Sequence, residues 1–513
     1  MASFAKIGME CLQDPLIWLF LAIASVALVI QPVPRRRPLP PAPGPKPLPV
    51  IGNMMMADQL THRGLAALAK QYGGLLHLRM GWLRIFVVST PEYAREVLHA
   101  QDNDDFWDRP ASIAILYLTY GCSDMAFAHD ARYWRQMRKL CVTKLFSRRR
   151  AETWLAVHDG YGELVRDIGR SSGEVVNLGE VIFKHTVRVI CRAAFSVRDV
   201  QGLEELIPML REFSKLLEAF HIGDLFPWLS WMGRRGFDSR LGAVRGVLGK
   251  FADKIIDDHM RRGKNPTEAD ADMVDDLLAF LGDAGQASAK DLRLTRDNVK
   301  ALIMDMLFGG PDNVGFTIEW AMAEMIHCPN ILLQLHRELA NIVGFERMVY
   351  ESDLAKLPFL KCVVKETLRM HPPIPVILRG TTKDCFLGGY SVPRGSRVFI
   401  NTWAINRDGE AWKDPGTFRP SRFMLNGDAI GLDLKGGCYE FLSFGSGTRS
   451  CPGQGLGQHA VEFAIAQLVH GFNWKLPDDM NPMELDMSDT IGSTVSRATR
   501  LCAVPTPRLR CPL

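Results

Sequence analysis

The stretch "FGSGTRSCPG", residues 444–453, decides which kind of fold the sequence predicts. It places Cys451 after a glycine-rich turn and before "GQGLGQHAVEFAIAQLVHGF", a helix-like run that starts at Gly453. A thiolate there would face backbone N–H groups and the positive end of a helix, which lower the pKa of a cysteine and favour metal ligation. Taken alone, the same residues also describe a glycine-rich turn around a buried cysteine.

The neighbours of Cys451 fit a site for a bulky ligand. Gly447 and Gly453 would permit backbone geometry and close approach that a side chain would block. Phe444 supplies an aromatic wall, and Arg449 supplies a guanidinium suited to pairing with a carboxylate.

These ten residues match the pattern F-x-x-G-x-R-x-C-x-G at every defined position, and so resemble the haem-binding loop of the cytochrome P450 superfamily. The resemblance implies that Cys451 is the axial ligand of haem b, with Phe444 and Arg449 beside the cofactor. It also implies a mainly α fold with a small β region, built as a single large haem domain. The hydrophobic pattern agrees, since most of the chain reads as helical and strand-like stretches occur near 75–90 and 380–402.

Two further segments match the family in its own order. "KETLR" places Glu366 and Arg369 one helical turn apart, where they can pair. On their own they would also describe a surface ion pair, which contributes little to stability. In the family this pair is joined by an arginine of a downstream segment, here Arg422 of "FRPSRF". The resemblance therefore implies a Glu366–Arg369–Arg422 network that braces the haem-binding core.

Further haem contacts are implied by the same resemblance. "WRQMR" contains Trp134 and Arg138, which match the family's pair beside a haem propionate. Arg379, soon after "HPPIP", would serve the other propionate. The likeness extends to "RATRLCAVP" near the C-terminus, so it covers essentially the whole chain.

The stretch "MLFGGPDNVGF", residues 306–316, weakens the centre of a predicted helix of roughly 33 residues. Thr295 can cap the start of that helix, and Cys328-Pro329 marks its end. Its centre nevertheless holds two glycines and a proline, all unfavourable inside a helix.

Family monooxygenases usually have [AG]-G-x-[DE]-T-[ST] at the corresponding place, over the haem. The resemblance implies that Gly310 borders the cofactor and that Asp312 and Asn313 take part in proton delivery to bound oxygen. Asn313 stands where the family has threonine, and Pro311 is an extra helix breaker. An amide donates and accepts through different atoms, so Asn313 would need an ordered water to relay a proton.

A cysteine thiolate on haem iron favours O–O cleavage, so the implied reaction is insertion of oxygen into a C–H bond. Electrons would come from NADPH through cytochrome P450 reductase. The basic segment 138–150 could receive that partner, or could be a solvated helix end. Two alternatives stay open: a reductase-independent haem-thiolate isomerase or dehydratase, and a haem-binding protein without catalysis.

Several long segments resemble the ferulate 5-hydroxylases of plants, among them "RPASIAILYLTY" and "LDMSDTIGSTVSRATR". This likeness implies hydroxylation of a phenylpropanoid ring, with coniferaldehyde, coniferyl alcohol or ferulate as substrate, in the synthesis of syringyl lignin. Ile113, Ile115 and Leu116 are candidate substrate contacts, although core packing explains them equally well. "ILRGTTKD", "FWDRP" and "GCSD" depart from the usual forms, so a related phenolic substrate is also compatible.

The N-terminus predicts a membrane anchor. "PLIWLFLAIASVALVI", residues 15–30, is an uncharged apolar run, and Arg35, Arg36 and Arg37 follow it. The positive-inside rule then leaves the rest of the chain in the cytosol. We expect an anchor over 1–31, a basic proline-rich hinge over 32–49 and a catalytic domain over 50–513, held at the endoplasmic reticulum. A cleaved signal peptide is the alternative, although its positive charges should precede the apolar run.

Composition excludes other classes. A net charge of +4 over 513 residues is too small to indicate a nucleic-acid partner. The 11 cysteines form no C-x-x-C pair, which argues against a zinc site or a disulfide framework and suits a reducing compartment.

Overall fold

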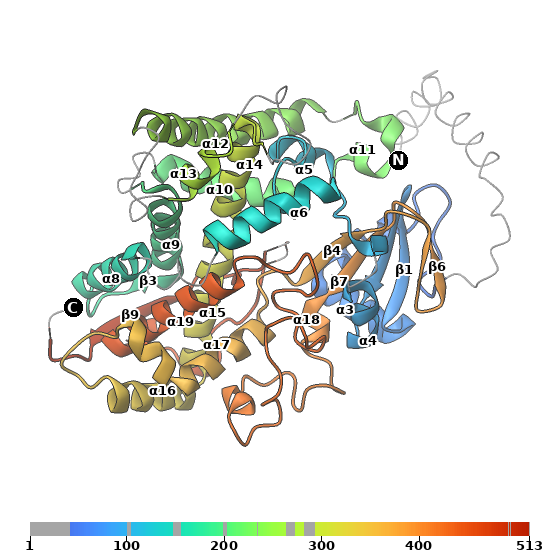
Figure 1. Cartoon of the computed structure of the whole chain (residues 1–513). Helices are drawn as coiled ribbons and strands as arrows, with labels where there is room; N and C mark the ends of the chain where they lie inside the picture. The colour runs from blue at the N-terminus through green and yellow to red at the C-terminus, as the bar shows by residue number, and fades with distance from the viewer. Residues whose placement is uncertain are drawn as a thin grey trace, which may run out of the picture.

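The chain folds into a helical part with a smaller β-sheet region at one side (Figure 1). A computed structural model describes residues 42–99, 104–146, 155–197, 203–232, 234–262, 272–281, 293–490, 492 and 494–511. The mainly α fold with a small β region, as predicted, is confirmed. The predicted anchor (1–31) and most of the hinge (32–49) lie outside the described residues.

Helices make up most of the described chain. The α-helices are α3 (His62–Tyr72), α4 (Pro91–Leu98), α5 (Ile113–Leu118), α6 (Ala131–Leu140), α8 (Leu155–Arg170), α9 (Leu178–Phe195), α10 (Leu203–Glu218), α11 (Ile222–Leu225), α12 (Arg234–Arg262), α13 (Met273–Leu278), α14 (Arg296–Gly309), α15 (Pro311–His327), α16 (Pro329–Ile342), α17 (Pro358–Met370), α18 (Thr402–Ile405) and α19 (Gln454–Gly471). Short 3-10 and π turns are η1 (Met54–Gln59), η2 (Asp104–Phe106), η3 (Cys141–Leu145), η4 (Pro227–Leu229), η5 (Glu351–Lys356), η6 (Pro420–Phe423), η7 (Pro477–Asp479) and η8 (Pro482–Glu484).

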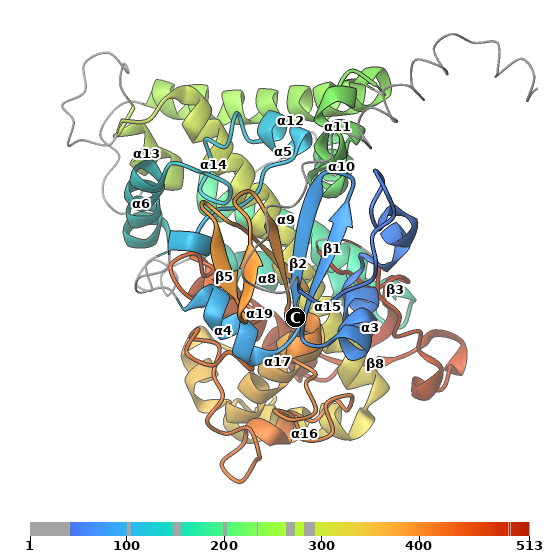
Figure 2. The ribbon, with the colours of Figure 1, turned by 90° about the vertical axis from the view of Figure 1, so that its right-hand side faces the viewer.

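The strands form three small sheets in the described part of the chain. The largest has the order β1 (Leu75–Met80), β2 (Leu83–Val88), β7 (Arg397–Asn401), β4 (Val376–Gly380); β2 and β7 are parallel and the other neighbours antiparallel. Figure 2 shows β1 and β2 in front of the helices. The remaining strands pair as β3 (Val176–Asn177), β9 (Cys502–Pro507) and β8 (Phe472–Lys475), and as β5 (Cys385–Leu387) with β6 (Tyr390–Val392). The stretches predicted near 75–90 and 380–402 are therefore strands.

Two helices are buried on nearly every side and form the centre of the core. In α15 every residue except Asn313 and His327 is buried, and in α19 the whole run 460–471 is buried. A helix that is apolar all round must lie inside the protein, and this pattern places α15 and α19 against each other. The loop that carries Cys451 leads directly into α19.

The predicted long helix is present as α14 followed end to end by α15. The side chain of Thr295 caps α14, and Cys328 ends α15, as predicted. The two helices are separated only at Gly310, which keeps right-handed helical angles. Backbone bonds from Gly310 N to Met306 O (3.1 Å) and from Val314 N to Gly310 O (3.1 Å) bridge the separation. Pro311 begins α15 and has no N–H to donate, which explains the interruption.

Candidate active site

The loop 444–453 folds back on itself and presents Cys451 just before α19. Cys451 N donates to Phe444 O (2.9 Å), and Ser450 N donates to Gly447 O (3.1 Å). Gly447 has φ of 72°, a left-handed conformation that most residues avoid, so the predicted need for glycine there is confirmed. Phe444 is partly buried and packs against the main core.

Cys451 is the one exposed cysteine among those that the structure describes. Desolvation by the protein atoms near its sulfur nevertheless raises the pKa of its thiol, despite a hydrogen bond from Gly453 N and the nearby guanidiniums of Arg138 and Arg109. The lowering of this pKa expected from the sequence is therefore wrong for the free thiol, because desolvation outweighs the helix end. Coordination to a metal ion would reverse this, since a coordinating thiol is deprotonated.

Four arginines gather beside this loop: Arg109, Arg138, Arg379 and Arg449. Arg138 Nη1 donates to Ser450 O (2.6 Å), and Arg109 Nη2 lies 3.5 Å from Arg449 O. Arg449 lies between two indole rings, with its Cζ 4.0 Å from the centre of Trp107 and 4.3 Å from that of Trp134.

The positive charge of this cluster is poorly balanced. None of the four arginines forms an ion pair with a carboxylate within the described part of the chain, and Nε of Arg109 and of Arg449 is buried without a partner. Burial, together with Arg109 and Arg449, holds the pKa of Arg379 well below its usual range. A thiolate and the two propionates of a haem are anions, so the donors present fit that cofactor.

Trp134, whose place beside a propionate stays a prediction, has its polar group engaged within the protein. Its indole Nε1–H donates to Met125 O (3.1 Å), so that donor already has a partner. Trp134 also forms a wall for the guanidinium of Arg449. Trp134 and Arg138 do share one face of α6, with Arg138 Cζ 5.9 Å from the indole centre.

The Glu366 network is present as predicted. Arg369 donates to Glu366 through Nε (2.8 Å) and Nη2 (2.9 Å), and Arg422 Nε donates to the same carboxylate (3.0 Å). All three side chains are fully buried, so the alternative of a surface ion pair is wrong. Their remaining N–H groups donate to backbone carbonyls of residues 406–417, which fixes the segment that leads to the Cys451 loop.

The α14–α15 junction has two different faces. Gly309 is exposed, and its carbonyl accepts from Asn313 Nδ2 (2.8 Å), while Asn313 Oδ1 is buried and has no partner among the residues that the structure describes. On another side, Asp312 accepts from Ser214 Oγ of α10 (2.8 Å). Burial raises the pKa of Asp312 to about 6. Asp312 and Asn313 are therefore adjacent in sequence but contact different elements.

Gly310 packs closely on α9, and its expected place beside the cofactor stays a prediction. A Cβ on Gly310 would lie 3.0 Å from Ile190 Cδ1 of α9, so this glycine serves close helix packing. A Cβ on Gly309 would meet nothing within 4 Å. The glycine with open space is thus one position earlier, because the helical rotation turns Gly310 toward α9.

The candidate substrate contacts on α5 differ from one another. Ile115 is buried in a core cluster with residues of α10 and α14, which agrees with the core-packing alternative. Leu116 is 46% exposed, and Ile113 N donates to Asp224 Oδ1 (2.9 Å). Their role as substrate contacts stays a prediction.

Sequence reasoning missed four residues of this region: Trp107, Arg109, Asp124 and Asp305. Trp107 and Arg109 lie in "FWDRP", which stood out only as a departure from the usual form. The signal that could have identified them is that departure, a tryptophan and an arginine close together before α5.

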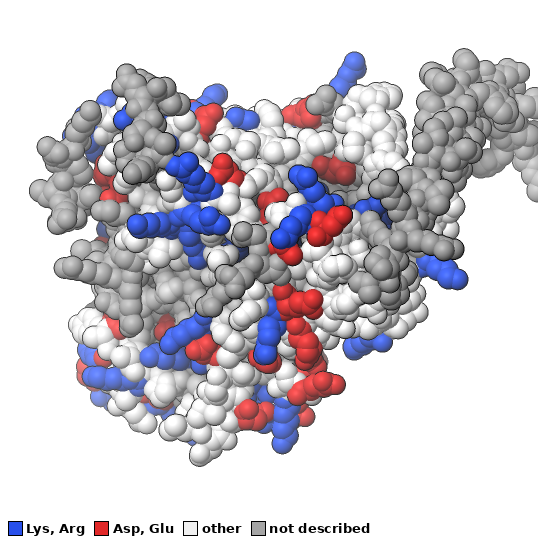
Figure 3. Space-filling view, turned by 45° about the vertical axis from the view of Figure 1, so that its right-hand side comes forward, with Lys and Arg blue, Asp and Glu red and all other residues white. Residues whose placement is uncertain are grey.

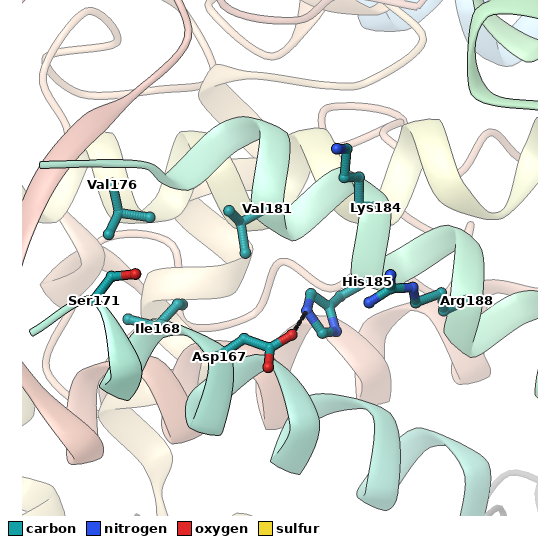
Figure 4. Close-up of a pocket in the computed structure, with 8 residues that line it drawn as sticks. All are labelled: Asp167, Ile168, Ser171, Val176, Val181, Lys184, His185 and Arg188. Atoms are coloured by element: carbon teal, nitrogen blue, oxygen red, sulfur yellow. Dashed lines mark hydrogen bonds and ion pairs between the residues drawn. The ribbon is translucent and has the colours of Figure 1, made fainter. Parts of the chain in front are cut away.

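A separate small pocket lies on the far side of α9. It is bordered by α8, β3 and α9, and His185 Nε2 contacts Asp167 Oδ2 there (3.0 Å; Figure 4). The opposite face of α9 packs on the α14–α15 junction through Ile190 and Phe183. The pocket is therefore separated from the junction by the thickness of α9.

Comparison with known proteins agrees with this geometry. A family model described as "Cytochrome P450" matches residues 41–500. "Cytochrome P450 84A1" of Arabidopsis thaliana is 50% identical over 98% of this chain and 98% of its own. "Cytochrome P450 84A4" of the same plant is 45% identical, over 93% and 94%. A zebra fish cytochrome P450 solved with abiraterone superposes with a TM-score of 0.72 at 26% identity, covering 87% of this chain and 99% of its own.

Proposed function

Because the chain belongs to the cytochrome P450 family, and is therefore a haem b monooxygenase supplied with electrons by a reductase, we propose that it hydroxylates the aromatic ring of a phenylpropanoid. The position attacked is next to an oxygen substituent already on the ring. Coniferaldehyde, coniferyl alcohol and ferulate are the candidate substrates, and syringyl lignin synthesis is the process. Two kinds of evidence support this proposal: the ferulate 5-hydroxylase-like segments and the 50% identity with cytochrome P450 84A1.

The observation that carries the proposal is the set of donors around Cys451. Cys451 is assigned as the iron ligand, and Arg109, Arg138, Arg379 and Arg449 would hold the propionates. When bound, the haem would activate dioxygen, and dioxygen is the source of the oxygen atom that enters the substrate. The protein's own part is to hold the cofactor, orient the ring, exclude water and deliver protons.

Proton delivery is assigned to the α14–α15 junction. The pKa of Asp312, about 6, keeps part of its carboxyl groups protonated near neutral pH, so this group can give and regain a proton. Asn313 holds the Gly309 carbonyl through Nδ2, which leaves Oδ1 able to accept a hydrogen bond from a water. Because the two side chains contact different elements, a water is needed to connect them.

The direct test uses microsomes that contain the full chain, with reductase, NADPH and a panel of guaiacyl substrates. We expect a hydroxylated product that requires both NADPH and reductase. Reductase-independent turnover of a hydroperoxide would instead identify the isomerase or dehydratase class. Uptake of haem with no product from any substrate of the panel would contradict the substrate proposal.

We further propose attachment to the cytosolic face of the endoplasmic reticulum through residues 1–31. None of the helices in the described ranges is long and apolar enough to cross a bilayer. An exposed aromatic patch, here called the tryptophan patch, supports contact with a membrane surface. It consists of Trp82, 53% exposed, with Trp228 and Trp231, 46% and 69% exposed.

The tryptophan patch joins two segments that are far apart in sequence. The rings of Trp82 and Trp228 lie 5.2 Å apart, and Trp82 N donates to Leu225 O (3.0 Å). Tryptophan is favoured at the membrane interface because one part of its ring is apolar and its N–H stays wet. On the face drawn in Figure 3, acidic and basic side chains are interspersed, so no block of one sign covers that face.

A vesicle flotation experiment tests this attachment. Removing residues 1–31 should release most of the protein while haem binding persists, and Trp228→Ser with Trp231→Ser should release the remainder. Leu425→Ser, at a side chain 86% exposed on a different segment, is the matched control and should change nothing. Loss of haem on truncation would mean that residues 1–31 belong to the catalytic fold. Unchanged flotation of the double tryptophan variant would remove the patch from the proposal.

A further inference from the structure

Two carboxyl groups meet inside the protein between α14 and the loop that precedes α6. Asp305 Oδ2 of α14 accepts from Met125 N (2.8 Å). Asp124, only 1% exposed, accepts from Phe127 N through Oδ1 (3.1 Å). Asp124 Oδ2 is buried and receives no N–H or O–H from the described residues, while the Asp124 side chain lies within hydrogen-bonding reach of the Asp305 carboxyl.

A carboxylate pair of this kind cannot carry two negative charges at low cost. Like charges in contact inside a protein disfavour double ionisation, so one proton is shared between the two groups. With that proton on Asp124, its unpartnered Oδ2 becomes a donor to Asp305 and the orphaned atom is satisfied. Burial raises the pKa of Asp305 to about 6, and burial together with Asp305 raises that of Asp124 well above its usual range.

The other titratable and charged groups around the pair do not replace the shared proton. Arg109 and Arg449 contribute positive charge from the loop before α5 and from the Cys451 loop. Cys122, Tyr133 and Cys141 face the pair from the ends of α5 and α6, and burial raises the pKa of the Tyr133 hydroxyl above its usual range and that of the Cys141 thiol to about 12. The Tyr133 hydroxyl and the Cys141 thiol stay neutral near pH 7, whereas the proton between the carboxyls titrates in that range.

The loop that these carboxyls hold is the acceptor for Arg449. Arg449 donates through Nη1 to Met125 O (3.3 Å) and through Nη2 to Ala128 O (2.5 Å). Trp134 Nε1 donates to the same Met125 carbonyl (3.1 Å). The carbonyl of Met125 thus accepts from Arg449, and the N–H of the same residue donates to Asp305. Arg449 lies two residues before Cys451, so α14 is linked to the Cys451 loop through residues 124–128.

We propose that Asp124 and Asp305 form a positioning pair, which by sharing one proton holds residues 124–128 in place to receive Arg449 and so secures the loop that carries Cys451. The pair does not touch the reacting atoms. It acts through the backbone of 124–128, and its loss should loosen the cofactor without removing any ligand.

The stabilising effect of the Asp124–Asp305 pair should depend on pH, and the sign of that dependence is defined. The folded pKa values of both acids are raised, so the stabilising effect of the pair is present at low pH and is lost as pH rises through those values. The pKa of Asp305 is about 6 and that of Asp124 is raised as well, so the shared proton leaves at a pH above the usual range of a carboxyl group. Two carboxylates would then repel, and residues 124–128 should become more mobile.

The test uses the full-length holoenzyme and two readouts that do not depend on turnover. Amide hydrogen exchange of the segment 123–130 reports the loop, and the rate of haem transfer to excess apomyoglobin reports retention of the cofactor. Asp124→Ala should raise both rates, by about tenfold, because it leaves the Asp305 carboxylate without its shared proton.

Asp124→Asn is the discriminating variant, since its amide can donate to Asp305 without a titrating proton. It should match the wild type near neutral pH and lack the increase in both rates that the wild type shows at higher pH. Glu462→Gln is the control, because Glu462 of α19 is also a buried acid with a raised pKa but has no contact with the loop. Wild-type exchange and haem transfer in Asp124→Ala would overturn the proposal, and so would an Asp124→Asn variant that keeps the wild-type pH step.

Discussion

The fully buried Glu366 network and the α14–α15 junction lie in the same core but satisfy their polar groups in opposite ways. The carboxylate of Glu366 accepts from Arg369, Arg422 and the backbone of Arg419, and its side chain is 0% exposed. At the junction, Asn313 Oδ1 has no partner in the described part of the chain, and Gly309 is exposed. An unsatisfied buried acceptor costs free energy, so its persistence points to function. The Glu366 network supports the loop that carries Cys451, whereas the α14–α15 junction keeps a free acceptor for the reaction.

The largest effect expected is at the iron ligand. Cys451→Ala should abolish the thiolate-type carbon monoxide difference spectrum, because no other described cysteine has this loop before a helix. Cys438→Ala is the matched control, since Cys438 is partly exposed and its sulfur lies 4.0 Å from its nearest acceptor, Gly431 O. A Cys451→Ala protein that keeps the spectrum would remove Cys451 as the ligand.

The Glu366 network should be next in size. Glu366→Gln leaves the buried guanidinium of Arg369 without a counter-charge and that of Arg422 with only Asp428, 3.6 Å away, and breaking a buried pair typically costs about 3–5 kcal/mol in the free energy of unfolding. We expect a lower unfolding temperature and little haem incorporation. If the variant unfolds like the wild type, the contrast between a rigid support and a reactive junction is wrong.

At the α14–α15 junction, restoring the family's threonine should raise the efficiency of product formation rather than the stability of the fold. Pro311→Thr with Asn313→Thr restores a hydroxyl that both donates and accepts, and should increase the ratio of hydroxylated product to NADPH consumed. Asp312→Ala should decrease that ratio, since general acid–base assistance contributes on the order of 10²–10⁴-fold. If neither variant changes the ratio with a guaiacyl aldehyde, the junction is not the site of proton delivery.

Asp312 should make the free energy of unfolding depend on pH. Its folded pKa of about 6 lies above the usual value of about 4, so its contribution to stability is complete below pH 4 and is lost as pH rises through 6. The difference in the free energy of unfolding between the wild type and Asp312→Asn should therefore fall by about 1–3 kcal/mol from pH 4 to pH 8. A pH-independent difference would contradict the raised pKa.

The smallest effect belongs to a partly exposed neighbour of the Glu366 network. Arg419 and Asp428 form an ion pair (2.8 Å) in which each side chain is 33% exposed. Asp428→Asn should change the free energy of unfolding by only about 0–1 kcal/mol. A loss as large as that of Glu366→Gln would show that burial is not what separates the two pairs.

Short segments were enough to predict much of this protein. The loop 444–453, the pair Glu366 and Arg369, and the capped helix from Thr295 to Cys328 depend on local spacing and backbone propensity, and the structure contains all three. Membership of the family adds Arg422, 56 residues away, because its partner is specified by the pattern. The anchor, the hinge and the substrate contacts remain predictions.

The tertiary structure alone decided which partner each side chain takes. Trp134 donates to Met125 O, and the glycine beside open space is Gly309, because helix rotation and packing against α9 turn Gly310 inward. Met125 and Asp305 are 180 positions apart, so no local pattern could pair them. Local sequence determines the geometry that each segment can adopt, whereas a buried polar group binds whichever partner the packing of distant segments brings within reach.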